Sequence, residues 1–82
     1  MTNNLWDDER QALRELLKEL RTEKAGLTQT ELSQALGRPQ SYVSKYENGE
    51  RRLDYVELYN ICRALDVAME DFDRLYEKRI QR

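Results

Sequence analysis

The sequence predicts an all-α protein, a compact five-helix bundle that contains a helix-turn-helix. Three observations lead to this fold class. Apolar residues recur at helical spacing along the chain, two Thr/Asp-x-x-Glu pairs stand where helices would begin, and glycines follow the apolar stretches. No segment alternates apolar and polar residues as a strand would. At 82 residues the chain is long enough for one domain, which we place at residues 1–82.

Residues 1–26 are expected to form the first helix, from about Leu5 to Lys24. Four leucines between residues 13 and 20 repeat at helical spacing, and Trp6 lies on the same stripe seven residues before the first of them. Asn4 is the expected N-cap. Gly26 supplies the left-handed residue that commonly closes a helix.

Residues 27–49 are expected to form two short helices joined by a tight turn. Thr28 and Glu31 have the spacing of a capping box, so the second helix should begin here and run for about two turns. Pro39 has a helical φ and no N–H, so it can open a third helix that runs to Glu47. Two short helices with a glycine between them have the shape of a helix-turn-helix.

Residues 50–82 are expected to form two more helices. Asp54 and Glu57 make the second capping pair, ahead of an apolar stripe in which Cys62 should be a small buried hydrophobe, and the last helix begins at about Glu70. Aromatic residues exceed what so small a core needs, so we expect some of them to form a homodimer interface. These residues are Tyr55, Tyr59, Phe72 and Tyr76.

The composition excludes several classes of function. The chain has no histidine and one cysteine, so neither a histidine-based triad nor the usual zinc site can be assembled, and we expect no enzyme activity, metal or cofactor. No apolar run approaches the roughly 20 residues that span a bilayer, and acidic residues stand where a signal peptide would be apolar. We therefore expect a cytoplasmic protein without a membrane partner.

The third predicted helix carries side chains suited to nucleic acid. Small hydroxyl, amide and ammonium groups on its outward side can donate and accept toward base edges in a major groove. The candidates for base reading are Gln40, Ser41, Ser44 and Lys45. The candidates for phosphate contact are Gln29, Arg38, Tyr42, Asn48 and Arg51. Residues 27–52 hold four basic and three acidic side chains, so this segment is net positive although the whole chain has a net charge of −2.

Two segments carry a family resemblance: LTQTELSQALG at residues 27–37 and QSYVSKYENG at residues 40–49. From Arg21 to about Phe72 the chain resembles the helix-turn-helix of the Xre and lambdoid phage repressors. The resemblance implies a lambda repressor-like five-helix fold, binding of double-stranded DNA as a two-fold dimer, and regulation of transcription. It also implies phosphate contacts and base contacts by particular residues. Gln29 and Asn48 would contact phosphates, while Gln40, Ser41 and Lys45 would read bases.

Two positions depart from the family pattern. That pattern suggests an ion pair between Arg21 and Glu47, but Ala25 is one residue more than the pattern has, so we expect the pair to be out of register. Pro39 replaces the hydroxyl residue that often caps the recognition helix, so the restricted φ and packing are expected to hold the first turn.

Three functions remain open at this point. The first is a repressor or controller that binds a palindromic operator as a homodimer. The second is an antitoxin that binds a toxin protein and regulates its own promoter. The third is a structural adaptor that keeps the fold without binding DNA.

Overall fold

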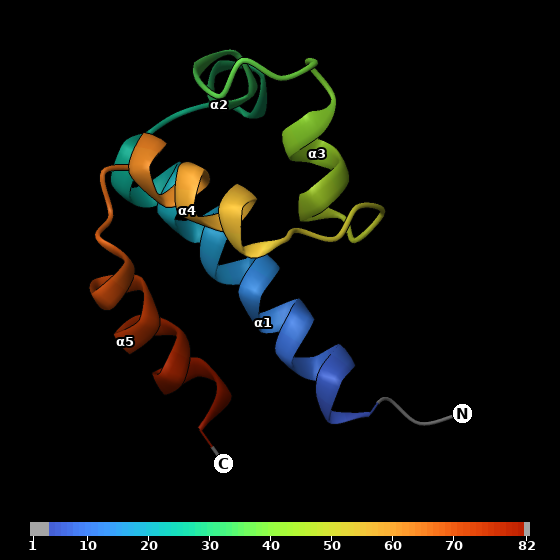
Figure 1. The fold of residues 1–82 in the computed structure, drawn as a ribbon, viewed down its shortest axis with the longest axis vertical. Helices are drawn as coiled ribbons and strands as arrows, with labels where there is room; N and C mark the ends of the chain where they lie inside the picture. Colours follow the sequence, from blue (N-terminus) through green and yellow to red (C-terminus); the bar gives the residue numbers. More distant parts are fainter. Residues whose placement is uncertain (1–3, 82) are drawn as a thin grey trace.

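The computed structural model describes residues 4–81, which form five α-helices and one π-helical segment (Figure 1). The described residues contain no strand, so the prediction of an all-α fold is confirmed. The bounds are α1 (Leu5–Glu19), η1 (Leu20–Ala25), α2 (Gln29–Ala35), α3 (Tyr42–Glu47), α4 (Tyr55–Ala64) and α5 (Met69–Ile80). None of these helices is both long and apolar enough to cross a lipid bilayer.

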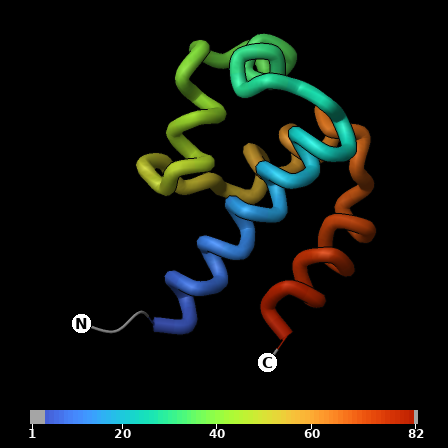
Figure 2. The backbone as a smooth tube through the Cα atoms, turned by 180° about the vertical axis from the view of Figure 1, so that it is seen from behind, coloured from blue at the N-terminus to red at the C-terminus, as the bar shows by residue number. Residues whose placement is uncertain are grey.

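The segments α1 and η1 form one long rod against which other helices pack. Figure 1 shows α3 and α5 on opposite sides of this rod, with α4 in front of it, and Figure 2 shows the same order from behind. The first turn of α1 extends away from the bundle. Leu5 is 50% exposed and Trp6 is 68% exposed, so the apolar stripe predicted from Trp6 onward enters the core only further along the helix.

Buried apolar side chains from all five α-helices meet in one core. Cys62 is fully buried, as predicted, and burial raises the pKa of its thiol to about 11, so the thiol stays neutral. The buried apolar residues are Leu16, Leu17, Leu32, Tyr42, Val43, Tyr46, Ile61, Cys62, Leu65, Val67 and Phe72.

Three helix starts agree with the capping residues that the sequence predicts. Thr28 Oγ1 accepts from the Glu31 N–H at 3.0 Å, while the Glu31 carboxylate accepts from the Thr28 N–H at 2.8 Å. Asp54 and the residue three positions later form the same reciprocal pair at the start of α4, and the Asn4 side chain caps α1. Local hydrogen bonds therefore define these starts.

The end of the first helix differs from the prediction. Beyond Glu19 the backbone continues as a π-helix, in which the Gly26 N–H bonds to the carbonyl of Arg21, five residues earlier. A π turn contains one residue more than an α turn, so Ala25 is absorbed without rotating Arg21 away from the core. The expectation that Ala25 would move Arg21 out of register is wrong.

The start of α3 also differs from the prediction, because the helix begins at Tyr42 and not at Pro39. The Tyr42 N–H donates to the Pro39 carbonyl at 2.9 Å, which closes a separate turn ahead of the helix. Gln40 and Ser41 therefore lie in this turn, and α3 itself is about 9 Å long.

Candidate nucleic-acid interface

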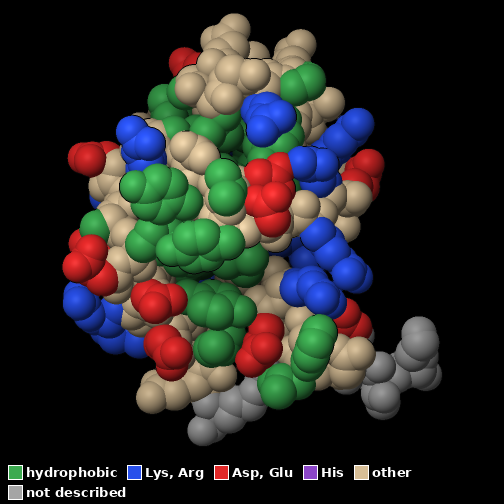
Figure 3. Space-filling model, in the orientation of Figure 1, with side chains coloured by type: hydrophobic (Ala, Val, Ile, Leu, Met, Phe, Trp, Pro, Cys, Tyr) green, Lys and Arg blue, Asp and Glu red, His purple; other side chains and the backbone are tan. Residues whose placement is uncertain are grey.

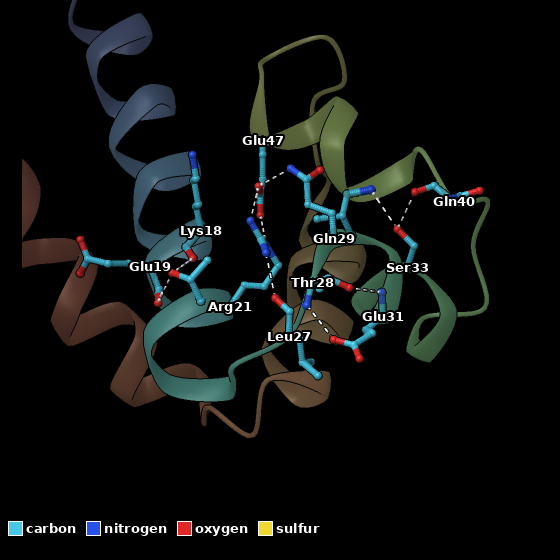
Figure 4. A network of polar contacts seen from close by, with 12 residues as sticks. Lys18, Glu19, Arg21, Leu27, Thr28, Gln29, Glu31, Ser33, Gln40 and Glu47 are labelled. Atoms are coloured by element: carbon cyan, nitrogen blue, oxygen red, sulfur yellow. Dashed lines mark hydrogen bonds and ion pairs between the residues drawn. The ribbon is translucent and has the colours of Figure 1, made fainter.

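A buried serine connects α2 with the start of α3. Ser33 is fully buried, and its hydroxyl donates to the Gln40 carbonyl at 3.3 Å and accepts from the Val43 N–H at 3.2 Å (Figure 4). The Val43 N–H is one of the donors that a helix start leaves without an intrahelical partner. The cap of α3 thus comes from a neighbouring helix. We had expected the fixed φ of Pro39 and packing alone to hold this turn.

A buried ion pair connects η1 with α3. Arg21 Nε donates to Glu47 Oε2 at 2.7 Å and its Nη2 donates to Oε1 at 3.0 Å, while Nη1 donates to the Leu27 carbonyl at 2.8 Å (Figure 4). The Gln29 amide adds a bond to Glu47 Oε1 at 2.9 Å. The two charged side chains are 8% and 5% exposed, so this pair holds α3 in a fixed orientation against η1 and α2.

The four candidate base-reading residues share one surface. Gln40, Ser41 and Lys45 are exposed and Ser44 is half-buried, with its hydroxyl donating to the Ser41 carbonyl at 3.0 Å. Thr30, which the sequence reasoning missed, completes this surface because its hydroxyl accepts from the Gln40 amide at 3.5 Å. The hydroxyl side chain of Thr30 at the start of α2 is the feature of the sequence that could have identified it. A shallow hollow between α2 and α3 is lined by Gln29, Thr30, Gln40, Ser41 and Ser44.

A comparison with protein-family models matches residues 17–72 to the family described as Helix-turn-helix. The matched region includes α2, α3 and the elements that position them. The chain belongs to the helix-turn-helix family of Xre and lambdoid phage repressors, whose members are DNA-binding regulators. A search of curated proteins and a search of solved structures each found no match.

Two candidate phosphate-binding arginines of this helix-turn-helix protein share one aromatic support. The exposed guanidinium groups of Arg38 and Arg51 lie 5.5 Å and 5.2 Å from the centre of the Tyr42 ring. Tyr42 itself is 8% exposed, and its hydroxyl donates to the Glu57 carboxylate at 2.9 Å. Burial, reinforced by Glu57, raises the pKa of Tyr42. Tyr42 therefore supports the arginines from the core, and its hydroxyl would have to leave Glu57 to contact a phosphate.

Acidic side chains of the same chain form ion pairs or hydrogen bonds with three of the candidate phosphate-binding residues. Arg51 forms an ion pair with Glu57. The Asn48 amide donates to the Glu50 carboxylate at 2.6 Å, and its oxygen accepts from the Glu50 N–H at 3.0 Å. Gln29 is bonded to the ion pair described above. Phosphate binding by these three residues would have to replace or share an existing bond.

Basic side chains gather on the side of the domain that carries α3. Figure 3 shows Lys and Arg side chains over α3, over the loop that follows it and over α1. Arg52 lies in that loop and forms no ion pair with the described residues. Within residues 4–81 no cluster of three or more His, Cys, Asp or Glu residues could hold a metal ion.

The aromatic residues predicted at the dimer interface divide into two pairs. Tyr55 and Tyr59 are 67% and 43% exposed on α4. Phe72 is 2% exposed and stacks on Tyr76, whose hydroxyl donates to the Glu9 carbonyl of α1 at 2.9 Å. Phe72 is therefore covered within one chain, and its expected place at the interface is wrong, whereas Tyr76 is half-buried and its place there stays a prediction.

Proposed function

We propose that this protein is a sequence-specific regulator of transcription that binds a palindromic DNA operator as a homodimer. The observation that carries the proposal is the polar surface on which Gln40, Ser41 and Ser44 line one hollow and Ser41 and Lys45 line the next. Ser33 holds the turn that presents this surface, and the Arg21–Glu47 pair orients α3. Preorganised polar groups on a fixed helix are the arrangement that major-groove reading requires.

In this proposal α3 and the turn before it enter the major groove. The Lys45 ammonium can donate to guanine O6 and N7, and the Gln40 amide can pair with adenine N6 and N7. Arg38, Arg51 and Arg52 lie around this surface and would neutralise phosphates. Affinity would then come mainly from the phosphates, and discrimination from the two long polar side chains.

The proposed dimer forms through the exposed apolar side of α4. Tyr55, Val56 and Tyr59 lie there, and Leu75 of α5 is also exposed. Exposed aromatic residues of this size are typical of the central part of protein interfaces. Two copies related by a two-fold axis would bind half-sites about 34 Å apart, which is one turn of the duplex.

Selection of bound sequences from a pool of random duplexes tests this function. We expect enrichment of one palindromic sequence. Replacing both Gln40 and Lys45 by alanine should abolish discrimination between that sequence and random DNA, because both base-reading side chains are lost. The control variant Lys78→Ala removes one positive charge from the exposed side of α5 and should keep discrimination. Enrichment of no sequence, or unchanged discrimination by the double variant, would contradict the proposal.

A further inference from the structure

A small hollow with three arginines lies between α1 and the loop that follows α3. Its volume is about 180 Å³, and it is separate from the hollow between α2 and α3. Two of the arginines, four residues apart on α1, share one side of that helix. The residues that line it are Arg10, Leu13, Arg14, Tyr46, Arg52 and Leu53.

The positive charges of this hollow are poorly compensated. Arg14 and Arg52 form no ion pair with the described residues, and Arg10 has a 3.7 Å contact with the exposed Asp7 carboxylate and lies 5.7 Å from the centre of the Trp6 ring. The Arg14 guanidinium lies against Gly49, where an added Cβ would be 3.3 Å from Arg14 Cζ. No acidic residue lines the hollow. Three like charges in one small space repel one another, and a bound anion would remove that repulsion.

Tyr46, which lines the same hollow, carries a hydroxyl without a hydrogen-bond partner within the described residues. The Tyr46 side chain is fully buried. Burial, with a contribution from the neighbouring Glu47, raises the pKa of this phenol, so the hydroxyl keeps its proton. Buried polar groups are almost always paired, and each exception needs an explanation. Because the hydroxyl is fully buried, a phosphate oxygen in the hollow would accept from it only once the side chains that cover it move aside.

We infer that this hollow is an oxyanion site for a phosphate group, with Arg10, Arg14 and Arg52 supplying the charge and Tyr46 supplying a neutral donor. A free phosphate and a DNA backbone phosphate share this chemistry. We favour the DNA backbone, because Arg52 directly follows Arg51 and basic side chains continue from α3 to α1 (Figure 3). That choice of source rests on the proposed function, whereas the site itself does not.

The first experiment uses the DNA-free protein and inorganic phosphate. The thermal midpoint of the wild type should rise by a few degrees in phosphate relative to chloride at equal ionic strength. Tyr46→Phe, which keeps the ring, and Arg14→Gln should lose most of that rise. The matched control Arg74→Gln changes an arginine of α5 whose side chain is 69% exposed, and it should keep the rise. An equal rise in all four proteins would overturn the site, because it would reflect a general effect of phosphate on proteins.

The second experiment identifies the source of the phosphate. Arg14→Gln should weaken binding to the selected duplex several-fold and reduce the slope of log affinity against log salt by about one, whereas Arg74→Gln should change neither. An unchanged slope in Arg14→Gln would overturn the DNA assignment. If the wild type prefers no duplex at all, the proposed function fails, but the phosphate titration still decides the oxyanion site.

Discussion

Buried polar side chains, rather than exposed ones, determine where the candidate base-reading residues lie. Ser33, Arg21 and Glu47 are all buried, and each satisfies its hydrogen bonds with partners from other elements. Pairing offsets part of the free-energy cost of burying a polar group, and removal of one partner leaves that cost uncompensated. The candidate base-reading surface therefore depends on buried residues behind it.

Glu47→Gln should lower the free energy of unfolding by about 3–5 kcal/mol, because it leaves the Arg21 charge buried and uncompensated. Urea unfolding followed by circular dichroism measures this loss. Asp71→Asn breaks an exposed ion pair with Arg74 and serves as the matched control, with an expected loss below about 1 kcal/mol. Equal losses in the two variants would show that the buried pair is not an important support of the fold.

Ser33→Ala should lower the free energy of unfolding by about 1–3 kcal/mol, because the Val43 N–H and the Gln40 carbonyl both lose a partner. DNA affinity should fall further than this loss of folded protein explains, since the turn that carries Gln40 is no longer held. The half-buried serine of α3 offers a comparison, because the Ser44 hydroxyl bonds only to the nearby Ser41 carbonyl and Ser44→Ala should be nearly neutral for stability. A Ser33→Ala protein as stable as the wild type would show that Pro39 alone maintains the turn.

At the scale of the element, α4 begins with a carboxylate that serves several neighbours. Burial by itself raises the pKa of the Glu57 carboxyl, but hydrogen bonds from the Asp54 backbone, Arg51 and Tyr42 outweigh burial. The pKa of Glu57 therefore lies below its ordinary value of 4.5. One residue thus caps α4 and also anchors the arginine and the tyrosine beside α3.

The pH dependence of stability should report this lowered pKa. A carboxyl whose pKa is lower in the folded state stabilises the fold above its unfolded pKa, and that contribution is lost as the pH falls through the folded value. Glu57→Gln should therefore flatten the decline of the unfolding free energy between about pH 5 and pH 2. Glu70→Gln, at an exposed position of α5, is the control for removal of one carboxyl. Identical pH profiles for wild type and Glu57→Gln would contradict the lowered pKa.

At the scale of the whole molecule, the exposed aromatic residues are Trp6 at the start of α1 and the two tyrosines of α4. Tyr55 is 67% exposed in the first turn of its helix, where an acidic side chain is well tolerated. Tyr55→Glu should therefore keep the fold while placing a charge within the proposed apolar interface. We expect sedimentation to show a shift toward monomer and DNA binding to weaken.

Gln81→Glu, which adds a charge at an exposed position after α5, is the control for this dimer experiment. It should sediment like the wild type. A wild type that remains monomeric at high micromolar concentration, or a Tyr55→Glu protein that dimerises normally, would refute the α4 interface.

The sequence predicted those parts of the fold that depend on contacts between residues close together in the chain. The starts of α1, α2 and α4 were predictable because their caps are bonds between residues three positions apart. The start of α3 was not, because its cap is Ser33 of another helix. The π turn before Gly26 was likewise not predictable from local signals, and it occurs together with the pairing of Arg21 with a residue 26 positions later in the chain.

For the candidate site, too, the sequence predicted what neighbouring residues determine and missed what distant residues determine. Exposure of Gln40, Ser41 and Lys45 agreed with a polar segment between glycines, which is a local property. The burial of Tyr42 and Phe72 could not be read from spacing, because helices distant in sequence cover both rings. The arginines of the hollow beside α1 come from segments about forty residues apart, so composition alone does not bring them together.

The ion pair of Arg51 with Glu57 has a kinetic consequence for the search for an operator. An arginine already neutralised within its own chain adds little attraction toward DNA of arbitrary sequence. The protein should therefore dissociate quickly from DNA that lacks the operator sequence. Arg51 can pair fully with a phosphate only where other contacts offset the loss of its ion pair with Glu57. The residence times on random DNA and on the operator would then differ more than the numbers of phosphate contacts in the two complexes suggest.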